Sequence, residues 1–282
     1  INDCLNEVAN DTPMHFQWYA ELIDKTFGKV PATDPSITSL IIKEPIGVVA
    51  GVVPWNFPLM MAVWKAAPAL ATGCSVIIKP AEDTPLSALR IAQIAKEAGI
   101  PDGVFNVVPG FGDVGEALGR HNDVDAVSFT GSTEVGGLFM KYSGESNLKT
   151  IGLEMGGKSP FLVLEDAKIN DTLIDNAINS AFWNGGQNCS ANMRQIIHSK
   201  VKDEFLDKVL KRIKNIKVGD PLDTETNMGS MISKGHLAKV DSYIQKGIDE
   251  GASILHGGIS DSNQKGFFAK PTLFDNVKEN MT

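Results

Sequence analysis

Residues 46–80 are IGVVAGVVPWNFPLMMAVWKAAPALATGCSVIIKP, and their pattern predicts the fold class. Two short β-prone runs, 46–53 and 74–80, enclose a longer apolar segment of helical periodicity at 58–73. A strand, a helix and a second strand in this order indicate two parallel strands joined by a covering helix. The region therefore favours an α/β fold.

The same alternation continues along the chain. Strand-like runs occupy 103–108 and 124–129, and segments of helical periodicity occupy 84–99, 112–120 and 132–144. Thr84-Pro85 precedes the first of these helical segments and Gly99 follows it, which is typical of a helix start and a helix stop. Repetition of strand and helix predicts an open parallel sheet with helices on both faces.

A second α/β block is expected after Lys158. Residues 160–166 and 193–198 are strand-like, whereas 170–186 and 201–216 have the periodicity of amphipathic helices. Before the first block, residues 29–45 are polar and contain three prolines around a β-prone centre. This composition favours an extended arm or an edge hairpin.

Composition and charge exclude several classes of partner. The chain has 282 residues, 43% of them hydrophobic, and a formal net charge of −8, with its 26 basic residues scattered rather than clustered. This pattern leaves no basic footprint for nucleic acid. No apolar run reaches the roughly 20 residues that span a bilayer, so we expect no membrane association. The first residues lack a basic leader and resemble a chain entered partway through a fold.

The cysteines and histidines indicate neither disulfides nor metal. Cys4, Cys74 and Cys189 are odd in number and widely spaced, which suits a reducing, cytoplasmic setting. The five histidines form no pair three or four residues apart. We therefore expect no metal site.

One motif points to a different class of protein. Residues 152–159, GLEMGGKS, satisfy the pattern of the phosphate-binding loop of ATP- and GTP-hydrolysing domains. That loop requires a helix directly after its lysine and serine, because the phosphates bind the helix's N-terminal amides. Pro160 and a strand follow instead, so we reject this alternative.

Cys189 lies in NGGQNCSANMR, residues 184–194, where a helix ends in glycines and a strand follows. A lone cysteine is most often an apolar filler of a core. The glycines, however, allow a ligand to approach the backbone closely and leave an amide hydrogen near the sulfur. These two features favour a nucleophilic thiol.

Four segments resemble the aldehyde dehydrogenase superfamily, and they occur in the order and approximate spacing of that family. They are 54–85, 129–136 (FTGSTEVG), 153–160 (LEMGGKSP) and 185–190 (GGQNCS). The resemblance runs from about Trp18 to the end of the chain. It implies an NAD-binding domain at 1–26 and 46–157, an arm for oligomerisation at 27–45, and a partial catalytic domain at 158–282.

The resemblance implies a covalent mechanism for aldehyde oxidation. Cys189 would attack the aldehyde carbon, and the side-chain amide of Asn56 together with the Cys189 backbone N–H would hold the alkoxide. Collapse of the alkoxide would expel hydride to the nicotinamide and leave a thioester. Glu154 would then activate the hydrolytic water; its ordinary alternative is a surface carboxylate paired with a lysine.

The resemblance also implies a dinucleotide site. Backbone amides at Gly131 and Ser132, at a helix start, would receive a pyrophosphate oxygen. Lys79 and Glu82 would bind the adenosine ribose, although a solvated charged turn is the alternative. Glu82 would repel a 2′-phosphate, so NAD is favoured and NADP is the second choice. The remaining expected cofactor contacts are Trp55, Gly112 and Gly136.

Aromatic residues suggest a class of aldehyde. By resemblance, the substrate tunnel is lined by Phe57, Met61, Trp64, Trp183 and Asn188, although Met and Trp at helical spacing are often plain core. Aromatic faces attract cationic groups. The sequence is also similar to γ-glutamyl-aminobutyraldehyde dehydrogenases, which favours an ω-amino or acylated amino aldehyde.

Family members continue past the last residues of this chain and also have further N-terminal helices. One expectation is therefore a fragment, or the ordered part, of a longer protein that forms a homodimer or homotetramer. The alternative is a catalytically silent dehydrogenase-like fragment that binds nucleotide or partners only.

Overall fold

The computed structural model describes residues 1–282, which divide into two units. The first is Asp3–Met155, and the second combines Ile1–Asn2 with Gly156–Thr282. The boundary lies at the end of the segment 150–155, directly before Gly156 and Gly157.

The Asp3–Met155 unit is built on a five-stranded sheet of order β3-β2-β1-β4-β5 in which every neighbouring pair is parallel. The strands are β1 (Val48–Val52), β2 (Ser75–Lys79), β3 (Phe105–Val107), β4 (Ala126–Gly131) and β5 (Thr150–Met155). This arrangement confirms the predicted α/β class with an open parallel sheet.

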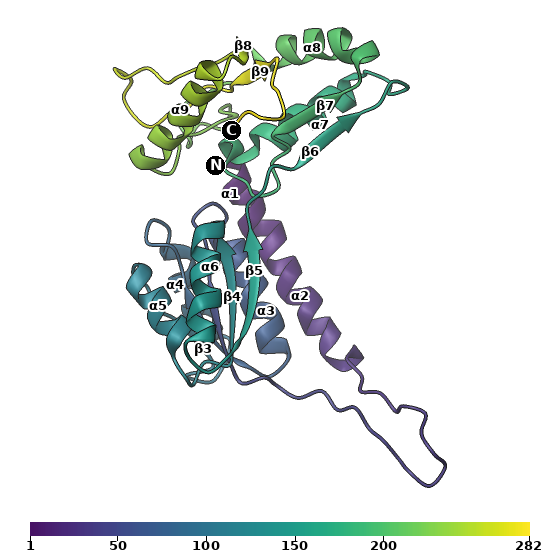
Figure 1. The fold of residues 1–282 in the computed structure, drawn as a ribbon. Coiled ribbons are helices and arrows are strands. Elements are labelled where there is room, and N and C mark those ends of the chain that lie inside the picture. Colours follow the sequence, from purple (N-terminus) through teal and green to yellow (C-terminus); the bar gives the residue numbers. More distant parts are fainter. The chain divides into compact units, whose positions relative to one another are not determined.

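Helices cover both faces of this sheet (Figure 1). They are α3 (Pro58–Ala71), α4 (Leu86–Glu97), α5 (Gly112–Arg120) and α6 (Thr133–Gly144). Alternate residues of a strand point to opposite faces, and β1 shows the result. Val49 packs in a core that contains α3 and β2 residues, whereas Ala50 and Val52 pack with Phe139 of α6. Burial on both faces explains why these strands are apolar runs rather than alternating ones.

Helical segments precede the sheet and were not indicated by the sequence pattern. They are α1 (Asn2–Asn6), the π-helical turn η1 (Glu7–Asp11), α2 (Thr12–Leu22) and the 3₁₀ turn η2 (Ile23–Lys25). Their large apolar side chains Leu5, Val8, Met14 and Trp18 are exposed. Because these helices bury no apolar stripe, their sequence lacks the apolar periodicity by which a helix is recognised.

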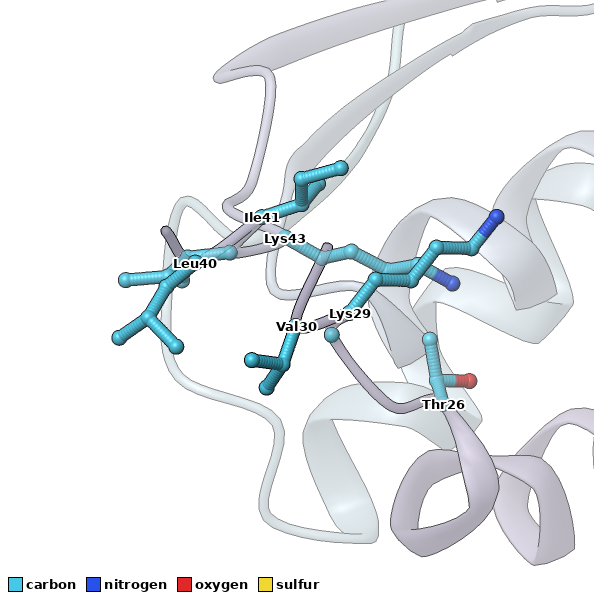
Figure 2. A pocket seen from close by; sticks show the side chains of 8 residues that line it. Thr26, Lys29, Val30, Leu40, Ile41 and Lys43 are labelled. Atoms are coloured by element: carbon cyan, nitrogen blue, oxygen red, sulfur yellow. The ribbon is translucent and has the colours of Figure 1, made fainter. Parts of the chain in front are cut away.

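Residues 27–45 are mostly extended and project from the sheet in Figure 1. One antiparallel bridge closes this arm, with Lys29 N and Ile41 O 3.0 Å apart and Ile41 N and Lys29 O 2.8 Å apart. Figure 2 shows Val30 and Leu40 pointing to one side of an open hollow and the lysines to the other. The apolar side chains of the arm are exposed, and Ile42 is 72% exposed.

The Gly156–Thr282 unit contains two small sheets. Strands β6 (Pro160–Val163) and β7 (Arg194–Ile197) are parallel, and β8 (Ser253–His256) and β9 (Leu273–Asp275) are antiparallel. The helices are α7 (Asp171–Phe182), the 3₁₀ turn η3 (Trp183–Gly186), α8 (Ser199–Ile213) and α9 (Lys234–Asp249). Val163, Ile174 and Phe205 are buried together where α7 and α8 cover β6. The second α/β lobe predicted from the sequence is present.

None of the helices combines the length and the apolarity that a membrane crossing requires.

Candidate active site

The carboxyl ends of all five parallel strands lie at one edge of the large sheet, where the arrows in Figure 1 end. The chain leaves β1 on one side toward β2, while β4 pairs with the other side of β1. Such a reversal of strand order opens a crevice at the carboxyl edge, where open α/β sheets bind ligands. The segments after β1 and β4 therefore flank the expected ligand site.

Asn56 lies in the segment that joins β1 to α3. Val53 begins this segment, and its N–H donates to Lys79 O at 3.1 Å. Phe57 ends it, buried in the core at the start of α3. The turn that carries Trp55 and Asn56 is thus held at both ends, and it stands at the carboxyl edge of the sheet.

Lys79 and Glu82 occupy the turn after β2. Lys79 is 6% exposed, and its ammonium lies 3.5 Å from a carboxylate oxygen of Glu82, which is exposed. The nearby hydroxyl oxygens of Thr84 and Ser87 are buried and have no hydrogen-bond partner. Buried polar groups are normally paired. This turn therefore has the donors and acceptors to bind a hydroxyl-rich group such as a ribose.

The segment after β4 forms an N-terminal helix cap. Ser132 Oγ accepts a hydrogen bond from Val135 N at 3.3 Å, which fixes the start of α6. Thr130, the residue before Gly131, is buried and its hydroxyl oxygen has no partner. A helix N-terminus and an unpaired hydroxyl together can bind an anionic or polar ligand.

Glycine is required at some of the expected cofactor positions. A Cβ on Gly131 would lie 2.5 Å from the Phe129 ring, and one on Gly136 would lie 2.7 Å from the Met155 sulfur. Gly112, at the start of α5, has nothing within 4 Å of a Cβ position. Gly131 and Gly136 are thus explained by packing, whereas Gly112 faces open space that a ligand could enter.

Glu154 is an exposed residue of β5, paired in register with Thr130 of β4. The sheet holds the Cα of Glu154 in a strand, and two glycines follow at 156 and 157. Glu154 is the second-last residue of this edge strand, so its carboxylate is exposed to solvent while its backbone is fixed by the sheet. Access to water and a fixed position are both properties that a general base needs.

Lys65 is a charged residue near Glu154 that the sequence reasoning did not single out. It lies in the apolar helix α3 and is 7% exposed, with its stem against Gly51. Burial lowers the pKa of Lys65, and the negative charge of Glu154 opposes this effect. The signal that could have found it is a single lysine in the otherwise apolar run 58–71.

Cys189 is exposed on a turn that follows η3. Asn188 Oδ1 accepts hydrogen bonds from Ser190 N at 3.2 Å and from Ser190 Oγ at 3.1 Å, and Cys189 Sγ lies 3.8 Å away. An asparagine that binds the amide two residues on makes an Asx turn. The Cys189 backbone N–H donates to no group of the chain. Thiol and free amide therefore share one turn, as covalent capture of a carbonyl requires.

The approach to this turn has unusual backbone. Asn184, Gly185 and Gly186 have φ values of 51°, 65° and 75°. After the turn, Asn192 N donates to Ser180 O at 3.0 Å, which fastens the segment to α7. A left-handed stretch followed by such an anchor turns the chain sharply and leaves the thiol at the surface.

The expected tunnel residues have different surroundings. Phe57 and Met61 are buried in the core between α3 and the sheet. Trp64 is exposed, with its ring centroid 5.6 Å from that of His15, and Trp183 is exposed at the start of η3. Asn188 shapes the cysteine turn. Phe57 and Met61 thus have the core role that helical spacing alone would suggest, and their part in a tunnel is a proposal.

No three side chains of histidine, cysteine, aspartate or glutamate are grouped so that they could hold a metal ion. The residues at the carboxyl edge of the sheet and those around Cys189 define, together with the fold, a class of protein. It is an α/β chain with a dinucleotide-type sheet edge and with an exposed cysteine on a turn that follows two glycines.

The profile of the aldehyde dehydrogenase family matches residues 1–282, and the chain belongs to this family. Aminoacetaldehyde dehydrogenase of Pseudomonas aeruginosa is 45% identical over 278 residues, which are 98% of this chain and 55% of that protein. The NADP/NAD-dependent aldehyde dehydrogenase PuuC of Escherichia coli K12 is 45% identical over 267 residues, 94% of this chain and 53% of that protein.

Among solved structures, the NAD+ complex of an aldehyde dehydrogenase from Bacillus cereus superposes with a TM-score of 0.94 at 42% identity. The match covers 98% of this chain and 57% of that one. The chain thus spans about half the length of the relatives that it matches.

Proposed function

We propose that the complete protein oxidises an aldehyde to a carboxylic acid, with NAD as the oxidant and Cys189 as the nucleophile. The observation that carries this proposal is the exposed thiol on its anchored Asx turn, beside an unpaired backbone N–H. Membership of the aldehyde dehydrogenase family over residues 1–282 supports it.

The proposed cycle has two half-reactions. The Cys189 thiolate adds to the aldehyde carbon, and the carbonyl oxygen becomes an alkoxide held by the Asn56 amide and the Cys189 N–H. The dinucleotide, when bound, accepts the hydride that leaves this carbon. The carbonyl re-forms as a thioester on Cys189. Glu154 then takes a proton from water, the oxygen attacks the thioester carbon, and the thiolate leaves with release of the acid.

The carboxyl edge of the sheet is proposed to hold the dinucleotide. The unpaired hydroxyls of Thr84, Ser87 and Thr130 and the open space at Gly112 fit a ligand with several hydroxyl and phosphate oxygens. In this assignment Trp55, Lys79 and Glu82 contact the cofactor, which also meets the start of α6 at Gly131, Ser132 and Gly136. The Bacillus cereus relative was solved with NAD+.

We expect Glu82→Gln to reduce the preference for NAD over NADP. The exposed Glu82 carboxylate beside Lys79 favours ribose hydroxyls and repels a 2′-phosphate. Removing its charge should lower the NAD:NADP ratio of kcat/KM by about fivefold to tenfold, since an unfavourable charge contact of this kind is worth about 1–1.4 kcal/mol. Asp83→Asn, at the next exposed position, is the control. An unchanged ratio in Glu82→Gln would remove Glu82 from cofactor selection.

We further propose an ω-amino or acylated amino aldehyde as the substrate. The relative from Pseudomonas aeruginosa is named an aminoacetaldehyde dehydrogenase. The exposed Trp183, six residues before the nucleophile, offers an aromatic face that can bind a cationic end. Trp64 is the second aromatic candidate.

A panel of aldehydes tests this substrate class. Trp183→Ala should raise KM for aminobutyraldehyde about fivefold to thirtyfold and leave KM for hexanal within about twofold, because a cation–π contact is worth about 1–2 kcal/mol. NADH formation measures both. Equal kcat/KM for the two substrates, unaffected by Trp183→Ala, would contradict the substrate class while leaving aldehyde oxidation intact.

For the complete protein we propose a homodimer or homotetramer in which the arm, residues 27–45, contacts a second subunit. Its exposed apolar side chains support this assignment. The three free cysteines support a reducing, cytoplasmic setting. A catalytically silent fragment is the alternative, and absence of NADH formation from the complete protein with every aldehyde of the panel would favour it.

A further inference from the structure

Helix α3 begins without a cap of its own. Phe57 is its N-cap residue and has no side chain that can accept a hydrogen bond, and Pro58 at the first helical position has no N–H. The amides of Leu59 and Met60 in the first turn need acceptors from elsewhere, since helical partners begin only further on. Asn56, the proposed oxyanion donor, is the residue directly before this uncapped start.

Glu7 supplies the missing acceptor from a distant part of the chain. Its carboxylate oxygen lies 2.6 Å from Met60 N, and the Leu59 N–H donates to the same carboxylate. The two residues Glu7 and Met60 are 53 positions apart. A negative group at a helix N-terminus is also favoured by the helix dipole. Glu7 therefore does for α3 what an N-cap side chain normally does.

The backbone at Glu7 is unusual as well. Glu7 opens the π-helical turn η1, where Thr12 N donates to Glu7 O. Single π turns inside α-helices are rare and occur often at functional sites. Glu7 is half-buried, and burial raises the pKa of its carboxyl while the two amides lower it. Burial of a carboxylate costs desolvation energy, and the two amide hydrogen bonds offset part of this cost, so the pKa of Glu7 is raised overall.

We propose that Glu7 is a positioning residue for Asn56: by capping the first turn of α3, it fixes the direction in which the Asn56 side-chain amide points. The inference rests on the proposed function, because Asn56 matters only if an alkoxide forms. Without the cap, the part-buried Met60 amide and the neighbouring Leu59 amide lose their acceptor, and the first turn of α3, which begins directly after Asn56 and Phe57, can shift. A small displacement of an oxyanion donor reduces turnover strongly.

A purely structural role is the competing explanation. Glu7 also joins the N-terminal helices to α3, so its loss could simply reduce the fraction of folded protein. The two explanations differ in one respect. If Glu7 acts through Asn56, removing Glu7 has little further effect once the Asn56 amide is gone, whereas a loss of folded protein would be the same in either background.

The experiment is a double-mutant cycle in the complete protein. KM is measured for each variant, and kcat is calculated from the concentration of reactive Cys189. Glu7→Leu should lower kcat about tenfold to a hundredfold with KM nearly unchanged, because the amide contributes chiefly in the transition state. Glu7→Gln keeps an acceptor oxygen and should stay within about threefold of wild type. In the Asn56→Ala background, Glu7→Leu should lower kcat by less than about threefold.

Glu21→Leu, at an exposed position of α2, is the matched control and should leave kcat unchanged. If Glu7→Leu does not fold, Glu7→Asp replaces it, because the shorter carboxylate cannot keep both amide bonds; kcat should then be lower in Glu7→Asp than in Glu7→Gln. Equal losses in both backgrounds, or no loss, would overturn the positioning role alone. Wild-type kcat in Asn56→Ala would overturn both this role and the proposed oxyanion assignment.

Discussion

Cys189→Ala should abolish aldehyde oxidation, with kcat falling by at least about 10⁴-fold. Without the thiolate no covalent adduct forms, and removal of a covalent nucleophile is among the largest single losses seen in enzymes. The folded structure should be retained, because the Cys189 side chain is exposed and its turn is held by Asn188 and Ser190. NADH formation under saturating aldehyde and NAD is the measurement.

Cys4→Ala is the matched control for this variant, since Cys4 is also an exposed free thiol. It should retain wild-type kcat. Residual oxidation in Cys189→Ala at the rate of Cys4→Ala would remove the nucleophile assignment.

The second large effect is expected from Glu154→Gln. In the proposed cycle the first half-reaction does not use Glu154 as a base. The variant should therefore still form a burst of about one NADH molecule per subunit. Steady-state turnover should then fall about 10²- to 10³-fold, because thioester hydrolysis lacks its base. Stopped-flow absorbance of NADH separates the two phases.

Glu165→Gln provides the comparison, because Glu165 is an exposed carboxylate shortly after β6 in the other unit. Glu165→Gln should have the same burst amplitude and the same steady-state turnover as the wild type. If Glu154→Gln instead lost the burst and the steady state to the same degree, Glu154 would act before the thioester, and its proposed role would be wrong.

The sheet could be predicted because its central strands are buried on both faces, and its covering helices because each has an apolar side and a polar side. Strands such as 48–52 then appear as continuous apolar runs, and helices such as 86–97 have apolar residues at helical spacing along one side. The helix predicted at 84–99 is shorter by two residues at each end. Helix ends depend on capping contacts, which sequence patterns locate only to within a residue or two.

Other elements gave no such signal. Strand β5 is only partly buried and contains Gly152 and the exposed Glu154, so it has neither a continuous apolar run nor strong β propensity. The N-terminal helices expose their largest apolar residues. The cap from Glu7 to α3 joins residues far apart in sequence, and no local pattern can indicate such a contact.

In the candidate site, too, features set by local sequence could be predicted, and features set by tertiary packing could not. The turn of Cys189 follows from nearby glycines and asparagines, whose conformational preferences are local. The buried Lys65 and the core positions of Phe57 and Met61 depend on which face of α3 meets the sheet. That choice is made by tertiary packing rather than by the spacing of apolar residues.

The central claim is that the aldehyde is carried as an acyl group on Cys189. Glu154→Gln, mixed with hexanal and NAD and quenched in acid within the first turnover, should be analysed by peptide mass spectrometry. The proposed mechanism predicts a mass increase equal to the acyl group on the peptide that contains Cys189, formed only when NAD is present. An unmodified Cys189 peptide while NADH is formed would contradict it.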